Sequence, residues 1–480
     1  MKRPSTTTWI WLAWLALGTV VVAIAAAYDT PLRRHGDSNS FLGCAVGLRT
    51  GQGFVSGLGP ETFRTPGYPL LVAAVQTVTG LGWRWALLLL QLGLLGHLGA
   101  LTAQLARSLW PERPGRADLA LAIVLFSPTL WLVATASLSD MPFAWLLALA
   151  LRGLWHARTT GSGRSALLAA LTLTAATFVR PIGLPLPLVL LPLAMVRATA
   201  GVRLALAAGL VIHLASVGAW AQRNAAWTGT PTFASVQEVN LDSYVAAAIE
   251  ARTQGRPWDA VRREFEREVE ALPPTERTAL RRRRGLATVA AHPLVAAEVW
   301  GRGVTAVVGQ SSLGHLASLI GLRQSNSGII YRFVSQPFDS FVVHMFEHEA
   351  ALLLLLLPGS LALLALWALA LRGAVRLWRE RRAVSVGLGA TIAVLLVLSG
   401  GPQSNDRFRV PLVAPLALLA ARGLGRQREG EADDSGSQGR PAPAATTSAS
   451  IGATASATPI AGPMARSCSA TAIGVDHSAV

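Results

Sequence analysis

The sequence predicts an all-α polytopic membrane protein. Only 14% of its 480 residues are charged, whereas soluble proteins average about 25%. Hydrophobic residues make up 52% of the chain, and its mean hydropathy is positive. A soluble protein of this length would need a more highly charged surface, so the composition indicates a chain that is largely embedded in a membrane.

Apolar runs recur along the chain at about the length that crosses a bilayer, roughly 17–25 residues. The first run follows Lys2 and Arg3 and is long for the core of a signal peptide, so we expect an uncleaved helix. About ten transmembrane helices are predicted, three of them short. They cover residues 9–27, 84–106, 119–136, 141–157, 165–179, 182–196, 203–220, 347–371, 383–399 and 410–423.

Arginine clusters lie between alternate predicted helices and fix the topology. The positive-inside rule places these clusters, and with them both chain termini, in the cytoplasm. The net charge of +16 therefore reflects topology and not nucleic-acid binding. The basic run 281–284 falls on the outer side, where long translocated segments are exempt from the rule.

This topology divides the chain into six parts. The first outer loop is predicted to contain interfacial helices, one opening at Asp37 and one at 70–78, because the apolar run 70–78 is too short to span. The parts are a first helix (1–27), the first outer loop (28–83), helices two to seven (84–220), a large outer segment (221–346), helices eight to ten (347–424) and a disordered cytoplasmic tail (425–480).

Two aspartates are candidate catalytic residues because the topology places both on the outer face. Asp37 opens the first interfacial helix, and Asp140 opens the fourth transmembrane helix. Each also fits a simpler role as a helix cap. A carboxylate pair on one face suits general-base work on a hydroxyl group, and both residues are candidates to bind a divalent cation, although the metal is left unknown.

Four arginines on the same face depart from the positive-inside trend. Such arginines suit phosphate binding through forked hydrogen bonds, and they also suit contact with lipid headgroups. They are Arg180, Arg223, Arg407 and Arg409.

The order of short motifs resembles bacterial GT-C type integral membrane glycosyltransferases, in particular those similar to protein O-mannosyltransferases and lipid A aminoarabinose transferases. The motifs begin with the first-loop stretch from Asp37 to Phe54 and Arg64-Thr-Pro-Gly-Tyr68-Pro. They continue with Ser139-Asp140, Phe178-Val-Arg-Pro181, Trp220-Ala-Gln-Arg-Asn224, His292-Pro293 and Arg407-Phe-Arg-Val-Pro-Leu412. The resemblance covers about residues 9–424.

The resemblance implies a GT-C fold and transfer of a sugar from a polyprenyl-phosphate donor, on the outer face of a bacterial cytoplasmic (inner) membrane. The acceptor is left open between protein, lipid and polysaccharide, and membrane lipids are the other expected partners. Asp37 matches the acidic residue that acts as base or positions the acceptor. The matched motifs add Glu61, Arg64, Tyr68 and Asn224 to the substrate-binding candidates.

Two other classes of function stay open. A transporter or flippase of a lipid-linked glycan would usually bury charges at mid-membrane and often show inverted repeats, whereas the charges here gather at the ends of the apolar runs. A polysaccharide ligase or polymerase would also have a large outer segment.

Overall fold

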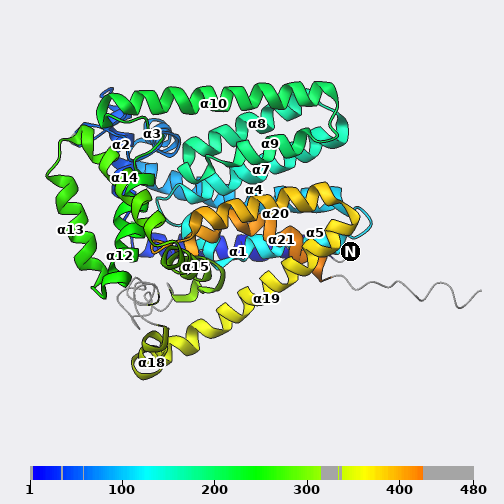
Figure 1. Cartoon of the computed structure of the whole chain (residues 1–480). Helices are drawn as coiled ribbons and strands as arrows, with labels where there is room; N and C mark the ends of the chain where they lie inside the picture. The colour runs from blue at the N-terminus through cyan, green and yellow to red at the C-terminus, as the bar shows by residue number, and fades with distance from the viewer. Residues whose placement is uncertain (1–3, 34–35, 58, 315–332, 334–337, 425–480) are drawn as a thin grey trace, which may run out of the picture. The chain divides into compact units, whose positions relative to one another are not determined.

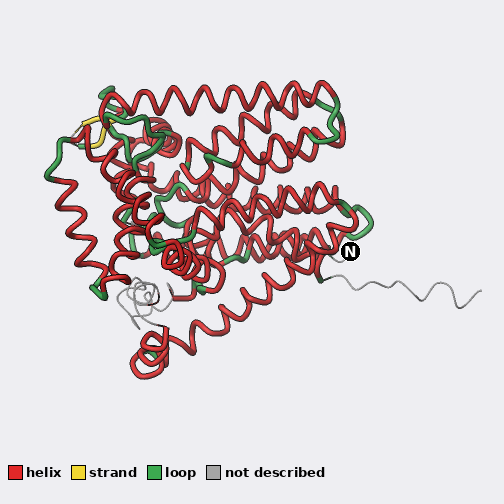
Figure 2. The backbone as a smooth tube through the Cα atoms, in the orientation of Figure 1, coloured by secondary structure: helices red, strands yellow, loops and turns green. Residues whose placement is uncertain are grey.

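The structure, a computed structural model, describes residues 4–33, 36–57, 59–314, 333 and 338–424. In the described part of the chain nearly all regular structure is helical (Figure 2). The strands named there are β1 (Val55–Ser56) and β2 (Gly59–Pro60), which pair antiparallel in the first outer loop. The predicted all-α class is therefore confirmed. The predicted tail, 425–480, lies outside the described residues.

Helices occupy all ten predicted membrane segments and run side by side across the bundle (Figure 1). They are α1 (Thr6–Ala27), α4 (Trp83–Leu109), α5 (Pro114–Leu125) with α6 (Pro128–Ala134), α7 (Asp140–Thr160), α8 (Gly163–Val179), η2 (Pro181–Gly183) with α9 (Leu186–Met195), α10 (Ala200–Thr228), α19 (Ala350–Glu380), α20 (Arg382–Ser399), and η4 (Asp406–Leu412) with α21 (Val413–Gly423).

Five helical segments of the described chain are long and apolar enough to cross a membrane by themselves. A sixth is a bent pair: the third predicted span, 119–136, is not one straight helix, because α5 and α6 meet at 50°. Pro128 opens α6 and has no backbone N–H to continue the ladder of α5, which explains the break. Helices α8 and α9 are apolar but shorter than a full span, so the count of ten remains a prediction.

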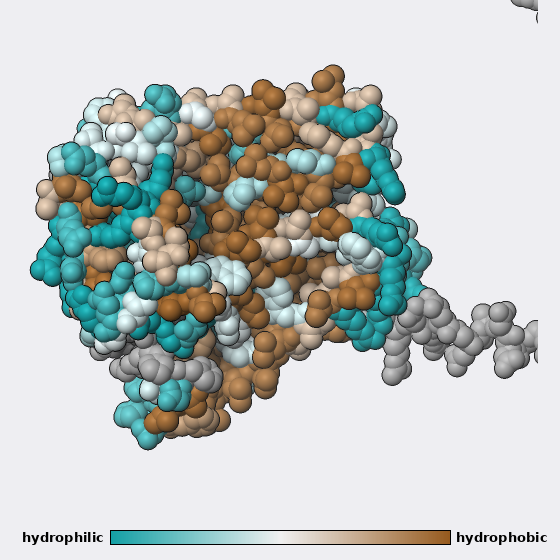
Figure 3. All heavy atoms as spheres, viewed as in Figure 1, coloured by the Kyte–Doolittle hydropathy of each residue, from teal (hydrophilic) through white to brown (hydrophobic). Residues whose placement is uncertain are grey.

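The outer surface of the bundle carries an apolar belt between two hydrophilic ends (Figure 3). Along the most apolar 18 residues of α1 and of α19, only 6% are buried inside the protein, and in α10 only 17%. Leucines, valines and tryptophans that face outward in this way suit lipid and not water. The chain is a multi-pass membrane protein.

The first outer loop holds α2 (Ser38–Arg49) and α3 (Gly67–Thr79). After α2, Gly51 and Gly53 have φ angles of 75° and 84° in the left-handed range, which glycine adopts readily, so the chain turns directly after this helix. The predicted short helix at 70–78 is longer than expected. Helix α3 leads through η1 (Gly80–Gly82) into α4, and Gly67–Leu109 forms one apolar stretch of 43 residues.

The large outer segment is helical and lies at the end of the bundle opposite the N-terminus (Figure 1). Its basic run is largely paired inside the segment: Arg281 and Arg284 both pair with the fully buried Asp242, and Arg282 pairs with Glu238. The run is therefore part of a folded ion-pair network. The elements are α11 (Val236–Val239), the π-helix η3 (Asn240–Ala246), α12 (Ala247–Gln254), α13 (Trp258–Glu270), α14 (Pro274–Ala291), α15 (Pro293–Gly309) and α18 (Phe338–His348).

Candidate functional site

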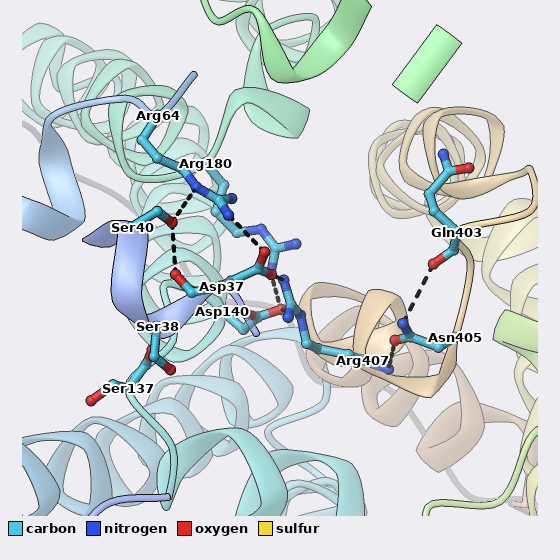
Figure 4. A network of polar contacts seen from close by, with 10 residues as sticks. All are labelled: Asp37, Ser38, Ser40, Arg64, Ser137, Asp140, Arg180, Gln403, Asn405 and Arg407. Carbon is cyan, nitrogen blue, oxygen red and sulfur yellow. Dashed lines mark hydrogen bonds and ion pairs between the residues drawn. The ribbon is translucent and has the colours of Figure 1, made fainter. Parts of the chain in front are cut away.

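Asp37 lies at the head of α2 and is held between two arginines (Figure 4). Its carboxylate accepts a hydrogen bond of 2.6 Å from Nη2 of Arg64 and one of 2.7 Å from Nη2 of Arg407. Although Asp37 occupies the N-cap position, its side chain makes no capping hydrogen bond. The interpretation of Asp37 as a simple helix cap is therefore wrong.

Asp140 is the first residue of α7 and is fully buried. Its Oδ1 atom forms an ion pair with Nη1 of Arg180 and lies 3.2 Å from Nε of Arg407. Its Oδ2 atom has no hydrogen-bond partner among the described residues. Arg407 thus bridges the two carboxylates, which come from segments more than 100 residues apart in the sequence.

Close backbone packing brings these five side chains together. Arg64 precedes α3, and a Cβ atom added to Gly67 would lie 2.7 Å from the carbonyl oxygen of Phe178, just before Arg180. Glycine is therefore required for the loop that carries Arg64 to approach the end of α8. Asn405 caps η4 by accepting from the backbone N–H of Arg407 at 3.0 Å, which fixes the start of that turn.

Two serines hold the head of α2 in place. Ser40 accepts from Nε of Arg64 at 2.9 Å and donates to the backbone oxygen of Asp37 at 2.8 Å. Ser38 donates to the backbone oxygen of Ser137 at 3.0 Å, which ties α2 to the segment before α7. Both were missed in the sequence, where Asp37-Ser-Asn-Ser40 gives no signal beyond a helix start.

The three arginines and two carboxylates, here called the ion-pair cluster, consist of Asp37, Arg64, Asp140, Arg180 and Arg407. Three positive charges against two negative ones leave a net charge of one. Burial raises the pKa of Asp37, but the attraction of Arg407 and Arg64 and their hydrogen bonds outweigh it and hold that pKa well below its usual range. Asp37 is therefore ionised, and the cluster suits an added anion.

The cluster is poorly suited to a divalent cation, although Asp37 and Asp140 were candidate metal ligands. Both carboxylates are already paired with guanidinium groups, which repel a cation. No group of three or more His, Cys, Asp or Glu side chains that could hold a metal ion gathers among the described residues. This donor set does not fit a divalent metal ion.

Glu61 and Tyr68 flank Arg64 without joining the cluster. Glu61 accepts from the backbone N–H of Arg64 at 3.1 Å and from Sγ of Cys44 at 3.6 Å, so it shapes the turn that carries Arg64. Burial and the Glu61 carboxylate raise the pKa of Cys44 to about 12, so this thiol stays protonated. Tyr68 is buried, with its ring edge-on to Phe41 at 5.1 Å.

Arg223 and Asn224 fasten the outer loops to the end of α10. Arg223 donates to the backbone oxygens of Glu61 at 2.5 Å and Phe54 at 3.0 Å. Asn224 donates to the backbone oxygens of Thr232 at 2.9 Å and of its neighbour at 3.1 Å. The described partners of both side chains lie in the outer loops and, for Arg223, also on α10 at Trp220 and Asn224, and a substrate role for the two residues stays a prediction.

Arg409 does not reach the cluster, although it is two residues from Arg407. It is 2% exposed and donates to the backbone oxygens of Val307 at 2.7 Å and Gln310 at 3.1 Å, and to the Thr129 hydroxyl at 2.9 Å. In the turn η4 the two side chains point to different partners. The guanidinium of Arg409 therefore joins α6, α15 and η4, and a substrate-binding role for it stays a prediction without support from these contacts.

Comparison with known proteins gives matches at the level of structure. No protein-family model matches the chain, and no curated protein matches it. ArnT from Cupriavidus metallidurans in the apo state is similar, with a TM-score of 0.38 and 16% identity over 88% of this chain and 78% of that one. The same protein bound to undecaprenyl phosphate gives a TM-score of 0.39 at the same identity and coverage.

AglB, the archaeal oligosaccharyltransferase from Archaeoglobus fulgidus, is also similar. Its structure in complex with an inhibitory peptide and a dolichol-phosphate gives a TM-score of 0.45 and 13% identity, over 86% of this chain and 50% of that one. ArnT and AglB are both GT-C glycosyltransferases, the kind of protein that the sequence motifs resemble. Similarities this distant do not assign a reaction to the chain.

Removal of the Asp140 charge should destabilise the protein. In Asp140→Asn the buried guanidinium of Arg180 loses its ion-pair partner, and breaking a buried pair from one side costs about 3–5 kcal/mol. We expect a clear fall in the melting temperature of the purified protein. A matched control is Asp339→Asn on α18, whose carboxylate is exposed. Equal melting temperatures for the two variants would contradict a buried Asp140–Arg180 pair.

Proposed function

We propose that this chain is an integral membrane glycosyltransferase. It moves a sugar from a polyprenyl-phosphate donor to a hydroxyl-bearing acceptor on the outer face of a bacterial cytoplasmic membrane, with both of its termini in the cytoplasm. The observation that carries the proposal is the ion-pair cluster, which holds two carboxylates and three arginines at one end of a bundle with an apolar outer belt. The sequence resemblance to GT-C enzymes supports the same class.

The arginines of the cluster are suited to the donor phosphate. Arg64 and Arg407 are each only 11–13% exposed, and their guanidinium groups converge on one carboxylate. A phosphate can take the place of that carboxylate, because it accepts the same forked hydrogen bonds. The polyprenyl tail would then extend along the apolar faces of the neighbouring helices, as an amphipathic lipid requires.

Asp37 is suited to act as the general base. Its side chain is 31% exposed, whereas Asp140 is fully buried, so an acceptor approaching from outside reaches Asp37 first. When the donor phosphate draws Arg64 and Arg407 away, the pKa of Asp37 should rise toward its usual range and its carboxylate becomes a better proton acceptor. Asp140 positions Arg180 and Arg407.

The reaction then needs one bond to form and one to break. The acceptor oxygen bonds to the anomeric carbon of the sugar, the bond from that carbon to the phosphate oxygen breaks, and the acceptor proton passes to Asp37. The leaving group is polyprenyl phosphate, whose developing negative charge Arg64, Arg180 and Arg407 would stabilise. The transferred sugar is a hexose or a pentose, and the acceptor is a protein, a lipid or a polysaccharide.

Mass spectrometry of cell-envelope glycans, glycolipids and glycoproteins tests the proposal. We expect a strain without this chain to lose one glycan modification and to regain it with the wild-type chain but not with an Asp37→Asn variant. Identical envelope profiles in all three strains would contradict a transferase. An accumulated lipid-linked glycan that stays on the cytoplasmic side would instead indicate a flippase.

A further inference from the structure

A partly open hollow lies far along the bundle from the ion-pair cluster. It is a half-open groove between α4, α7, α9 and α20. Its walls lie near the C-terminal ends of α4, α7 and α9 and near the N-terminal start of α20 (Figure 1). Helix α7 begins at Asp140 in the cluster and reaches the hollow at Leu151–Arg158, about 16–27 Å further along at 1.5 Å per residue.

The lining of the hollow is apolar except at its rim. Leucine side chains from all four helices make up half of the lining residues, and Arg158 is the one charged residue among them. The lining leucines are Leu105, Leu151, Leu154, Leu190, Leu193 and Leu388.

Two arginines and a tryptophan mark the rim. Arg158 donates to the backbone oxygen of Val196 at 2.9 Å, and the guanidinium carbon of Arg381 lies 5.7 Å from the centre of the Trp155 ring. Within the described chain neither arginine forms an ion pair with a carboxylate. Tryptophan is typical of the membrane–water interface, and unpaired guanidinium groups beside it suit an anionic headgroup.

We propose that this hollow binds an anionic glycerophospholipid of the leaflet at the arginine-rich end. One acyl chain would occupy the leucine-lined space, and the phosphate would lie against Arg158 and Arg381. Basic pockets between membrane helices bind acidic lipid headgroups in this way. The inference is independent of the proposed transferase activity, since the hollow lies at the other end of α7 from Asp140.

Lipid retention by the purified full-length protein tests the site. Native mass spectrometry would be run after adding dioleoyl phosphatidylglycerol or dioleoyl phosphatidylcholine in detergent. We expect the wild type to retain the anionic lipid at least about tenfold better, and Arg158→Ala/Arg381→Ala to lose most of that preference, since charge-assisted hydrogen bonds are among the stronger ones. Arg283→Ala, which removes an exposed arginine from α14, is the charge control and should match the wild type.

A second variant tests the tail pocket without changing any charge. Gly387 lines the hollow, and a Cβ atom added there meets nothing within 4 Å, so Gly387→Leu introduces a side chain into the hollow without strain at its Cβ atom. Gly389→Leu on the same helix also has open space but does not line the hollow, and is the matched control. We expect only Gly387→Leu to reduce retention of phosphatidylglycerol, by about tenfold, at an unchanged or higher melting temperature.

Three results would overturn this inference. Equal retention of the two lipids by the wild type would show that the site does not select an anionic headgroup. Unchanged retention in Gly387→Leu would show that the lipid is held by surface charge alone and that no acyl chain occupies the hollow. Competition by glycerol phosphate as strong as that by phosphatidylglycerol would show that the site binds a free phosphate and not a lipid.

Discussion

Replacement of Asp37 by asparagine should lower the turnover of sugar transfer by about 10²–10⁴, the usual contribution of a positioned general base. The variant keeps the size of the side chain and one oxygen that can accept from Arg64, but it cannot take a proton from the acceptor. The stability cost should be about 1 kcal/mol, because the carboxylate is 31% exposed. Turnover and melting temperature of the same purified variant separate a catalytic from a structural loss.

The matched control for this variant is Asp29→Asn. Asp29 lies in the same outer loop, is exposed, and has a φ angle of 48°, a conformation that asparagine also tolerates. We expect it to behave like the wild type. Wild-type turnover in Asp37→Asn would show that a group other than Asp37 takes the proton of the acceptor hydroxyl.

Loss of Arg407 and loss of Arg409 should have different consequences, although the two residues are neighbours in one turn. Arg407→Ala should weaken binding of the lipid-phosphate donor by about tenfold to a hundredfold, since charge-assisted hydrogen bonds contribute about 1.5–3 kcal/mol. Arg407→Lys should restore only part of the affinity, because lysine offers a point charge in place of a fork. Titration of each detergent-purified variant with polyprenyl phosphate gives the dissociation constants.

Arg409→Ala should act on stability. It leaves the buried backbone oxygen of Val307 without this donor, at a cost of about 1–3 kcal/mol, and also removes a bond to the part-buried oxygen of Gln310. We expect a lower melting temperature, and an affinity for polyprenyl phosphate close to that of the wild type in the fraction that remains folded. The opposite pattern, a stable Arg409→Ala protein that fails to bind polyprenyl phosphate, would show that Arg409 contributes to the donor-phosphate site.

Topology was enough to predict which residues share one face. Asp37 and Arg407 are separated by 370 residues, yet the alternation of apolar runs and arginine clusters placed both at the outer ends of helices. Hydrophobic runs and basic clusters are strong signals because the bilayer penalises every misplaced charge. That is why the segments of the bundle could be located from the sequence.

The direction of each side chain could not be predicted in this way. A turn such as η4 sends Arg407 to the cluster and Arg409 into the helix interface, and this follows only from the packing of α6 and α15 against it. The basic run at 281–284 shows the same limit. Its neutralisation depends on Asp242 in a π-helix some 40 residues earlier, a contact that no local pattern marks.

The affinity of the Asp37→Asn variant for polyprenyl phosphate tests the central claim most directly. Asp37 forms ion pairs with both Arg64 and Arg407, so under the proposed function its carboxylate would compete with the donor phosphate for them. The account therefore predicts that Asp37→Asn, although nearly inactive, binds polyprenyl phosphate several-fold more tightly than the wild type, by about 1 kcal/mol. A variant that binds the lipid phosphate more weakly than the wild type, or not at all, would contradict the ion-pair cluster as the donor-phosphate site.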